Sequence, residues 1–186
     1  MPWPKTRKRE TREKILKSAI ELFAQKGFHS VSLEDVLKNA ELTRGAFYSH
    51  FKSKSELYRE AVLAATDTAP LAEYADEDNL FLNKILSSYL SEEHVKHEVS
   101  PCPLAAFSTD TFSQSPDIKD AYSEVFEKLL EMLQKETDGE ITDRQSAMSL
   151  AALMIGGVVV SRALSDDKLI QELLTACVSN APLLLK

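Results

Sequence analysis

Four positions that could contact a polyanion lie within six residues of one another: Thr43, Arg44, Gly45 and Tyr48. A guanidinium can donate two hydrogen bonds to one guanine edge, and hydroxyl groups donate to phosphate oxygens or base edges. Glycine lets the backbone approach a partner closely. The cluster therefore predicts a short, exposed segment that binds duplex DNA.

The residues around this cluster predict the helices that position it. Ser32 and Asp35 have the spacing of a capping box, which predicts the start of one helix. Thr43 is a good N-cap for a second helix, and Ser53 with Glu56 predicts another capping box and a third. Two short helices joined by a tight turn are typical of a helix-turn-helix motif. The first of them has its apolar residues on one face: Leu33, Val36, Leu37 and Ala40.

This segment resembles the N-terminal domain of the TetR family of bacterial repressors. The resemblance rests on Phe23, Gly27-Phe28, Val31, Val36 and Ala40, and on LTRGAFYSHFKSKSELY at residues 42–58. It covers the first third of the chain, whereas the rest is similar only in length and helical character. It implies an all-α fold of about nine helices, with a helix-turn-helix DNA-binding domain at 1–53 and a larger regulatory and dimerisation domain at 54–186. Five glycines, seven prolines and no strand-like alternation agree with a helical chain.

Charge is unevenly distributed along the chain. The formal net charge is −7, but residues 1–60 carry a net +5 and the other 126 residues a net −12. Because charges beyond a Debye length of ~8 to 10 Å are largely screened, DNA responds to the basic end. We expect the basic segment from Lys5 to Arg12 to form a flexible arm that reaches the DNA backbone or minor groove. A solvated helix face is the alternative.

The resemblance also implies roles for single residues. Residues that match Thr43, Arg44, Gly45 and Tyr48 lie against the major groove, and those that match Tyr48 and His50 contact the DNA backbone. Lys54 is expected to donate to phosphate from the start of its helix, while His50 could instead cap or pack. Ser32 and Lys52 are further candidates. Glu41 occupies a turn position where family members often have glycine, and a positive φ there would cost ~1 kcal/mol.

Helical periodicity predicts the rest of the architecture. We expect helices over about 9–26, from 54 to a break before Pro70, and over 80–90, 103–112, 116–133 and 142–164, with a last helix opening at Asp166 or Asp167. Thr142 with Gln145 is the predicted cap of the penultimate helix. A linker rich in Glu, His and Pro is expected between Leu90 and Pro103.

The penultimate helix is apolar on nearly every side from Leu150 to Val160, so both its faces need cover. The family pairs through its last two helices as a four-helix bundle, which implies a homodimer and a palindromic operator with half-sites about 34 to 36 Å apart or somewhat more. The expected interface residues are Ala152, Gly156, Val159, Leu173 and Cys177. Core packing is the alternative for the glycines.

The family also implies a small, largely apolar effector bound among the regulatory helices. The candidate lining residues are Phe81, Tyr89, Cys102, Phe107, Tyr122, Phe126 and Met148, with ordinary core packing as the alternative. Cys102 falls at a predicted helix N-cap, where a reactive thiolate could sense oxidants or electrophiles, although a free cysteine is more often buried. His94 and His97 could bind a metal, but we expect two solvated histidines and no cofactor.

Other classes of protein fit the sequence less well. The chain has no nucleophile paired with a base, no metal motif and no phosphate loop, so a helical-bundle enzyme ranks last. A DNA-binding architectural or activating protein without an effector remains open. Residues 1–12 lack the apolar core of a signal peptide, and the apolar run 150–160 is short for a membrane span, so we expect a cytoplasmic protein.

Overall fold

The computed structural model describes residues 5–65, 81–96, 102–136, 141 and 143–185. Within these residues the chain is all α, as predicted, and contains no strand. The helices are α1 (Lys5–Ser30), α2 (Leu33–Asn39), α3 (Arg44–Tyr48), α4 (Lys54–Ala64), α5 (Phe81–Tyr89), α6 (Glu92–Val95), α7 (Pro103–Thr111), α8 (Pro116–Glu136), α9 (Arg144–Ala163) and α10 (Asp167–Asn180), followed by the 3-10 turn η3 (Ala181–Leu184).

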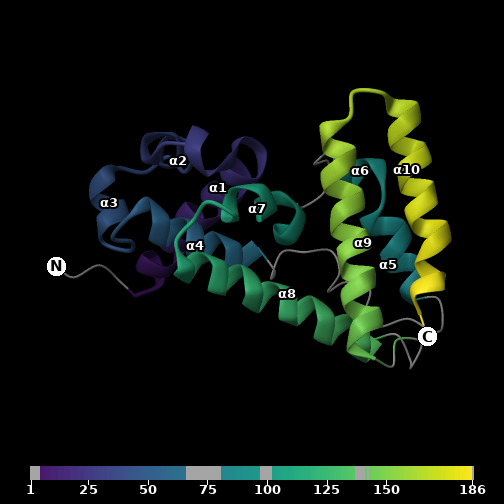
Figure 1. Cartoon of the computed structure of the whole chain (residues 1–186). Helices are drawn as coiled ribbons and strands as arrows, with labels where there is room; N and C mark the ends of the chain where they lie inside the picture. The colour runs from purple at the N-terminus through teal and green to yellow at the C-terminus, as the bar shows by residue number, and fades with distance from the viewer. Residues whose placement is uncertain (1–4, 66–80, 97–101, 137–140, 142, 186) are drawn as a thin grey trace.

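The helices form two groups that α7 and α8 connect. Figure 1 shows α1 to α4 together at one end and α9 and α10 side by side at the other, with α8 running beneath from one group to the other. Helix α4 packs against α1 and also against α8, and α7 contacts both α1 and α9. The buried apolar side chains form one continuous cluster through both groups. The N-terminal helices are therefore held by the larger helical part rather than tethered to it by a loose linker.

The first helix extends further toward the N-terminus than expected. Helix α1 begins at Lys5, so the basic segment to Arg12 is helical and is not the flexible arm that we predicted. Arg12 pairs with Glu60 of α4 at 2.9 Å, and its guanidinium lies 5.2 Å from the centre of the Phe51 ring. Contacts with α4 and the turn before it thus hold this end of α1 in place.

Gly27 interrupts α1 at the predicted point. Its φ is 78°, a conformation that favours glycine, and a Cβ there would lie 2.8 Å from Asp110 Oδ2. The same carboxylate accepts a hydrogen bond from the Phe28 backbone N–H at 2.7 Å. Asp110 belongs to α7, so the end of α1 is fastened directly to the larger helical part.

Several expected helix ends differ in detail. Asp143, and not Thr142, caps α9, because its side chain accepts from Ser146 N at 2.9 Å; Thr142 lies outside the described residues. Ser53 Oγ accepts from Glu56 N, but the Glu56 carboxylate accepts from Lys52 N, so the second capping box is only half formed. The predicted linker after Leu90 contains the short helix α6, capped by the Ser91 side chain. We did not foresee α6 because four residues carry too little periodicity.

Helix α9 is the only described helix long and apolar enough to cross a membrane by length and composition. We had expected no such helix, because the apolar run 150–160 by itself is short for a membrane span. In the fold it packs against α6, α7, α8 and α10. Core helices of soluble proteins meet the same criterion, so the finding alone assigns no membrane role.

Candidate nucleic-acid interface

Helix α2 is fixed to α1 by its N-terminal cap and by side-chain hydrogen bonds. Ser32 N donates to Asp35 Oδ2 at 2.8 Å, and Ser32 Oγ accepts from Asp35 N at 3.1 Å, which confirms the predicted capping box. These bonds lower the pKa of Asp35. From α1, Ser18 Oγ donates to Val36 O at 2.8 Å and accepts from Asn39 Nδ2 at 3.0 Å. The α2 helix therefore has little freedom to shift against α1.

The turn between α2 and α3 passes through a left-handed residue. Glu41 has a φ of 55°, the only positive φ among the described non-glycine residues. Leu42 N donates to Leu37 O at 2.9 Å, which closes the turn. Since an L-residue pays ~1 kcal/mol or more in this region, Glu41 holds the strain that we anticipated from the missing glycine.

Helix α3 is anchored by one aromatic ring and exposes the rest of its surface. Phe47 is fully buried and stacks on Phe51 at 5.7 Å between ring centres. Thr43 is the N-cap residue, although its side chain makes no cap hydrogen bond, and α3 ends at Tyr48. Tyr48 is 62% exposed, with its ring edge against Phe47. The fold therefore presents Thr43, Arg44, Gly45 and Tyr48 to solvent.

Gly45 is not required by the packing of the protein. A Cβ at this position would have Thr43 Oγ1 as its nearest neighbour, at 4.0 Å. Its φ is not in the left-handed region, because Gly27 is the only described glycine with a positive φ. Gly27 thus has a structural reason for glycine, whereas the packing of the described residues gives none for Gly45.

The guanidinium of Arg44 forms an ion pair with Glu34 of α2. Both side chains are mostly exposed, at 70% and 56%, so water screens the pair and the carboxylate can be exchanged for another anion. The pair keeps Arg44 over the surface that α2 and α3 share.

The other predicted contact residues are divided by the fold. Lys52 is exposed and Ser32 is exposed with its hydroxyl engaged in the cap. His50 lies half-buried after the end of α3, and burial together with the charges of Lys8 and Arg12 lowers its pKa. Because both cations act on this ring, the N-terminal end of α1 extends the positive potential beside α3.

Lys54 makes a different contact from the one we expected. Its amine donates to the Phe28 carbonyl oxygen and lies 4.2 Å from the centre of the Phe28 ring. Burial lowers its pKa, while Asp110 and Asp35 act in the opposite direction. The amine is therefore directed into the junction between α1 and α4 in the free protein, and its contact with phosphate stays a prediction.

The predicted effector residues differ in burial. Tyr89, Cys102 and Phe107 are buried, Tyr122 and Phe126 are half-buried, and Met148 is 39% exposed, which excludes it from an enclosed pocket. Phe81 begins α5, and its side chain is outside the described part. None of these residues lines the hollow between α1 and the regulatory helices or the hollow beside α5 and α10. Sequence reasoning missed the residues of these hollows because they come from helices far apart in the chain.

Cys102 and His94 belong to one buried cluster. Cys102 is the N-cap of α7, as predicted, and accepts a hydrogen bond from Tyr89 Oη at 3.1 Å. Burial raises the pKa of this thiol. His94 is buried, contrary to the expectation of a solvated side chain: its Nε2 accepts from Cys102 N at 3.2 Å, and its Nδ1 lies 2.6 Å from Tyr89 O. His97 lies outside the described residues.

Comparisons with known proteins agree with the helix-turn-helix. Residues 15–61 match the family of bacterial regulatory proteins, tetR family. The chain is 53% identical over 51 residues to the HTH-type transcriptional regulator AcrR of Shigella flexneri, covering 27% of this chain and 24% of that protein. It is 33% identical over 91 residues to UidR of Escherichia coli (strain K12), covering 48% of this chain and 46% of that protein.

The match to these curated relatives therefore spans less than half of their length. The fold as a whole is similar to the crystal structure of E. coli NemR in its reduced form, with a TM-score of 0.75, 23% identity, and coverage of 95% of this chain and 97% of the other. The family match at residues 15–61 includes the helices that display the exposed Thr43-to-Tyr48 surface. Residues 15–61 therefore match the DNA-binding part of the tetR family of bacterial regulatory proteins, and the chain as a whole has the fold of solved TetR regulators, such as one from Legionella pneumophila (22% identity, TM-score 0.74, all of both chains covered).

Proposed function

We propose that the chain represses transcription by inserting α3 into the major groove of a specific DNA site. The observation that supports this most directly is the exposed surface of Thr43, Arg44, Gly45 and Tyr48 above a single buried anchor, Phe47. Arg44 can contact guanine N7 and O6, and the Tyr48 hydroxyl can donate to phosphate or a base edge. Gly45 lets the start of the helix approach the groove floor. His50, Lys52 and Ser32 are proposed as contacts to the DNA backbone.

We divide the chain into a DNA-binding domain at 1–53 and a regulatory and dimerisation domain at 54–186. Under this division α4 is the connecting helix, because Leu57, Tyr58 and Ala61 are buried between the two parts.

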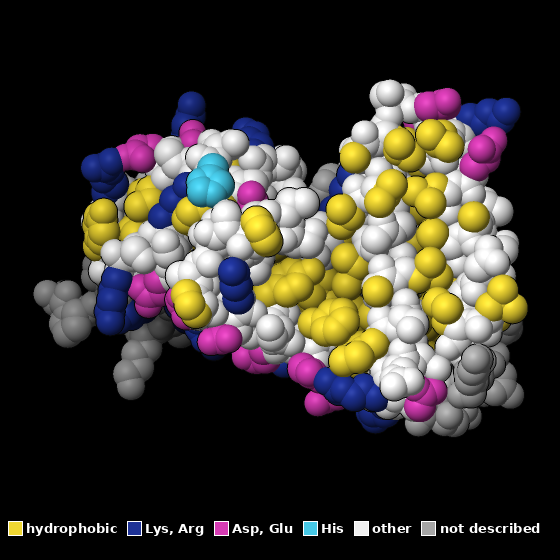
Figure 2. Space-filling model, in the orientation of Figure 1, with side chains coloured by type: hydrophobic (Ala, Val, Ile, Leu, Met, Phe, Trp, Pro, Cys, Tyr) yellow, Lys and Arg dark blue, Asp and Glu magenta, His cyan; other side chains and the backbone are white. Residues whose placement is uncertain are grey.

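The regulatory part is proposed to form a twofold dimer through α9 and α10. Hydrophobic side chains gather over these two helices on the face shown in Figure 2. Ala152 is exposed, Val160 is 49% exposed, and Gly156, Val159 and Leu173 are partly exposed, although they belong to apolar helices. A second subunit would cover this surface and place two α3 helices on one face of a palindromic operator, with half-sites one helical turn or more apart.

Two of the predicted interface residues have a different environment. Cys177 is buried, and its Sγ lies 3.2 Å from the position that a Gly157 Cβ would take, so it packs within the subunit. A Cβ on Gly156 would meet nothing within 4 Å, whereas one on Gly157 would lie 2.8 Å from Leu90. Close helix approach therefore explains Gly157, and Gly156 remains a candidate for the dimer surface.

Release from DNA is proposed to follow the binding of a small effector that shifts the spacing of the two α3 helices. A regulator of the same fold without an effector is the first alternative. Sensing through Cys102 is the second, and it is disfavoured because the thiol is buried and its pKa is raised. Operator binding that responds to an electrophile in the wild type but not in Cys102→Ser would restore this alternative.

The DNA contacts are tested with Arg44→Ala and Tyr48→Ala on an operator selected from random oligonucleotides. Each variant should lose about 1 to 3 kcal/mol of operator binding, or ~5- to 150-fold in Kd, with nearly unchanged thermal stability. The matched control is Arg144→Ala, which removes another exposed arginine paired with a glutamate of a neighbouring helix, Glu127. Unchanged operator affinity in both Arg44→Ala and Tyr48→Ala would refute the proposed contacts.

A further inference from the structure

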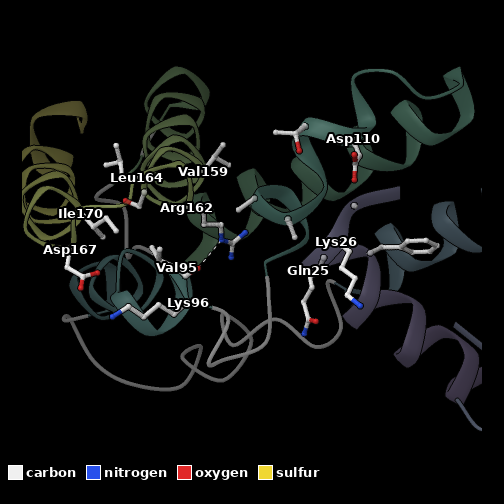
Figure 3. A pocket seen from close by; sticks show the side chains of 17 residues that line it. Gln25, Lys26, Val95, Lys96, Asp110, Val159, Arg162, Leu164, Asp167 and Ile170 are labelled. Carbon is white, nitrogen blue, oxygen red and sulfur yellow. Dashed lines mark hydrogen bonds between the residues drawn. The ribbon is translucent and has the colours of Figure 1, made fainter. Parts of the chain in front are cut away.

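A hollow of about 670 Å³ lies between the end of α1 and the regulatory helices. Phe23, Lys26 and Gly27 of α1 form one wall, and Val95, Arg162 and Ile170 are part of the opposite one. In Figure 3 Gln25 and Lys26 project from α1 on one side, Arg162 projects from α9 on the other, and Asp110 lies on α7. Its volume is within the ~300 to 1,000 Å³ range of small-molecule sites.

Arg162 is a partly buried cation without an acidic partner among the described residues. Its Nη2 donates to His94 O at 3.0 Å and its Nε to Val95 O at 3.3 Å. Among the described residues no carboxylate lies within ion-pair distance of it, and Nη1 has no hydrogen-bond partner. Because a desolvated charge is costly unless it is paired, this guanidinium provides an unfilled position for an anion.

The neighbouring residue offers an unused hydroxyl in the same hollow. Ser161 is fully buried, and its Oγ has no hydrogen-bond partner in the described part of the chain. A buried hydroxyl without a partner destabilises the fold, so a ligand oxygen that accepts from Ser161 would recover that cost. Ser161 and Arg162 therefore provide a donor pair from adjacent positions of α9.

The charged side chains that line the hollow are three cations and two carboxylates. Lys26 and Lys96 line it together with Arg162, against Asp110 and Asp167. Asp110 already accepts from the Phe28 N–H, and Lys96 pairs with Glu92 at 2.7 Å. Apolar side chains from four helices and the α9–α10 turn complete the wall: Phe23, Val95, Val159, Leu164 and Ile170.

We propose that this hollow binds a small organic anion with an apolar body, such as a medium-chain or aromatic carboxylate. The carboxylate accepts hydrogen bonds from Arg162 and Ser161, and the hydrocarbon part lies against Val95, Leu164 and Ile170. This site differs from the one among the core aromatics that the sequence suggested.

Occupancy of this site acts on the DNA-binding helices at short range. The residues 23–27 form part of the wall, and the next residue, Phe28, is the one that Asp110 holds from α7. A ligand that changes the spacing between α9 and the end of α1 also changes the contact that orients α1, and with it α2 and α3. This regulatory consequence rests on the proposed function, whereas anion binding itself does not.

The binding site is tested by calorimetric titration of the full chain with octanoate, with octan-1-ol as the uncharged probe of equal chain length. Octanoate should bind and octan-1-ol should bind at least ~10-fold more weakly, because its uncharged hydroxyl cannot form an ion pair with Arg162. Arg162→Gln should weaken octanoate binding ~10-fold or more. Because Arg162 also contacts two backbone carbonyls, Ser161→Ala is the second variant: it should weaken binding ~3- to 10-fold without lowering the melting temperature.

A blocking variant locates the site independently of charge. Thr109 is exposed and lines this hollow, and Thr175 is exposed and lines the separate hollow beside α5 and α10. Thr109→Trp should abolish octanoate binding, and Thr175→Trp should leave it unchanged. Equal octanoate affinity in the wild type, Ser161→Ala and Thr109→Trp would overturn the site, as would equal affinity for octan-1-ol.

The outcomes separate this inference from the proposed function. No octanoate binding at millimolar concentration, together with intact operator binding, overturns the anion site alone. Octanoate binding that leaves operator affinity unchanged overturns the regulatory consequence. Octanoate binding by a chain that shows no preference for any duplex sequence supports the site and refutes the proposed function.

Discussion

Replacement of Gly45 by alanine separates the requirements of DNA binding from those of folding. The added methyl group meets no protein atom closer than Thr43 Oγ1 at 4.0 Å, so it causes no clash in the free protein. Alanine exceeds glycine in helix propensity by up to ~1 kcal/mol in a helix interior, and by less in the first turn of the short α3. The variant should therefore be as stable as the wild type or slightly more stable.

The same methyl group should weaken operator binding. If the start of α3 lies against the groove floor, a Cβ on residue 45 enters a closely packed interface. Overpacking of this kind costs typically ~1 to 3 kcal/mol, which corresponds to a ~5- to 150-fold increase in Kd. Stability and affinity would then change in opposite directions, a result that a destabilised protein cannot produce.

The assay combines thermal unfolding with fluorescence anisotropy on a labelled operator at a fixed salt concentration. Ser123→Ala, on the exposed surface of α8, is the control for added helix propensity away from the DNA-binding domain. It should leave operator affinity unchanged. If Gly45→Ala bound the operator as tightly as the wild type, the close approach of α3 that we infer from the unexplained glycine would be refuted.

Two further predictions concern the regulatory helices. Burial lowers the pKa of His94 below the ordinary 6.5 and its Nε2 must stay unprotonated to accept from Cys102 N, so the unfolded chain takes up the proton more readily. The contribution of neutral His94 to the free energy of unfolding is complete above about pH 6.5. Denaturant unfolding should show that it is lost as the pH falls below this value, by up to ~1.4 kcal/mol per pH unit. An equal dependence of the unfolding free energy on pH in His94→Gln would contradict this prediction. Ala152→Glu, which places a charge on the exposed apolar surface of α9, should yield monomers in analytical ultracentrifugation and weaken operator binding ~100-fold or more, whereas Ser123→Glu on α8 should do neither. A dimeric Ala152→Glu protein would refute the proposed interface.

The helix-turn-helix could be predicted almost completely because its determinants are local. The Ser32–Asp35 cap, the stop at Gly27 and the start of α7 at Pro103 each depend on residues within a few positions along the chain. The buried position of Phe47 follows from the spacing of the residues around it. Such features form wherever the local sequence permits them, and the fold did not override them.

Helix α6 and the His94–Cys102 cluster show where local pattern was insufficient. Their residues read as a polar linker, yet the Tyr89 and Arg162 contacts surround His94 with protein on several sides. Burial of a polar side chain depends on what the rest of the chain places above it. The sequence has no local marker for that.

The contacts between the two parts of the molecule were decided by tertiary structure alone. The family resemblance implied that Lys54 donates to phosphate, and in the structure without DNA its amine reaches the carbonyl of Phe28. Asp110 reaches the Phe28 N–H across 82 residues, and the hollow beside it combines side chains of α1, α6, α7, α9 and α10. Sequence determined the helices and the exposed face of α3, because caps and helical spacing act within one or two turns. Only the packing of distant helices decided which charged groups meet one another, since that depends on the positions of whole elements in space.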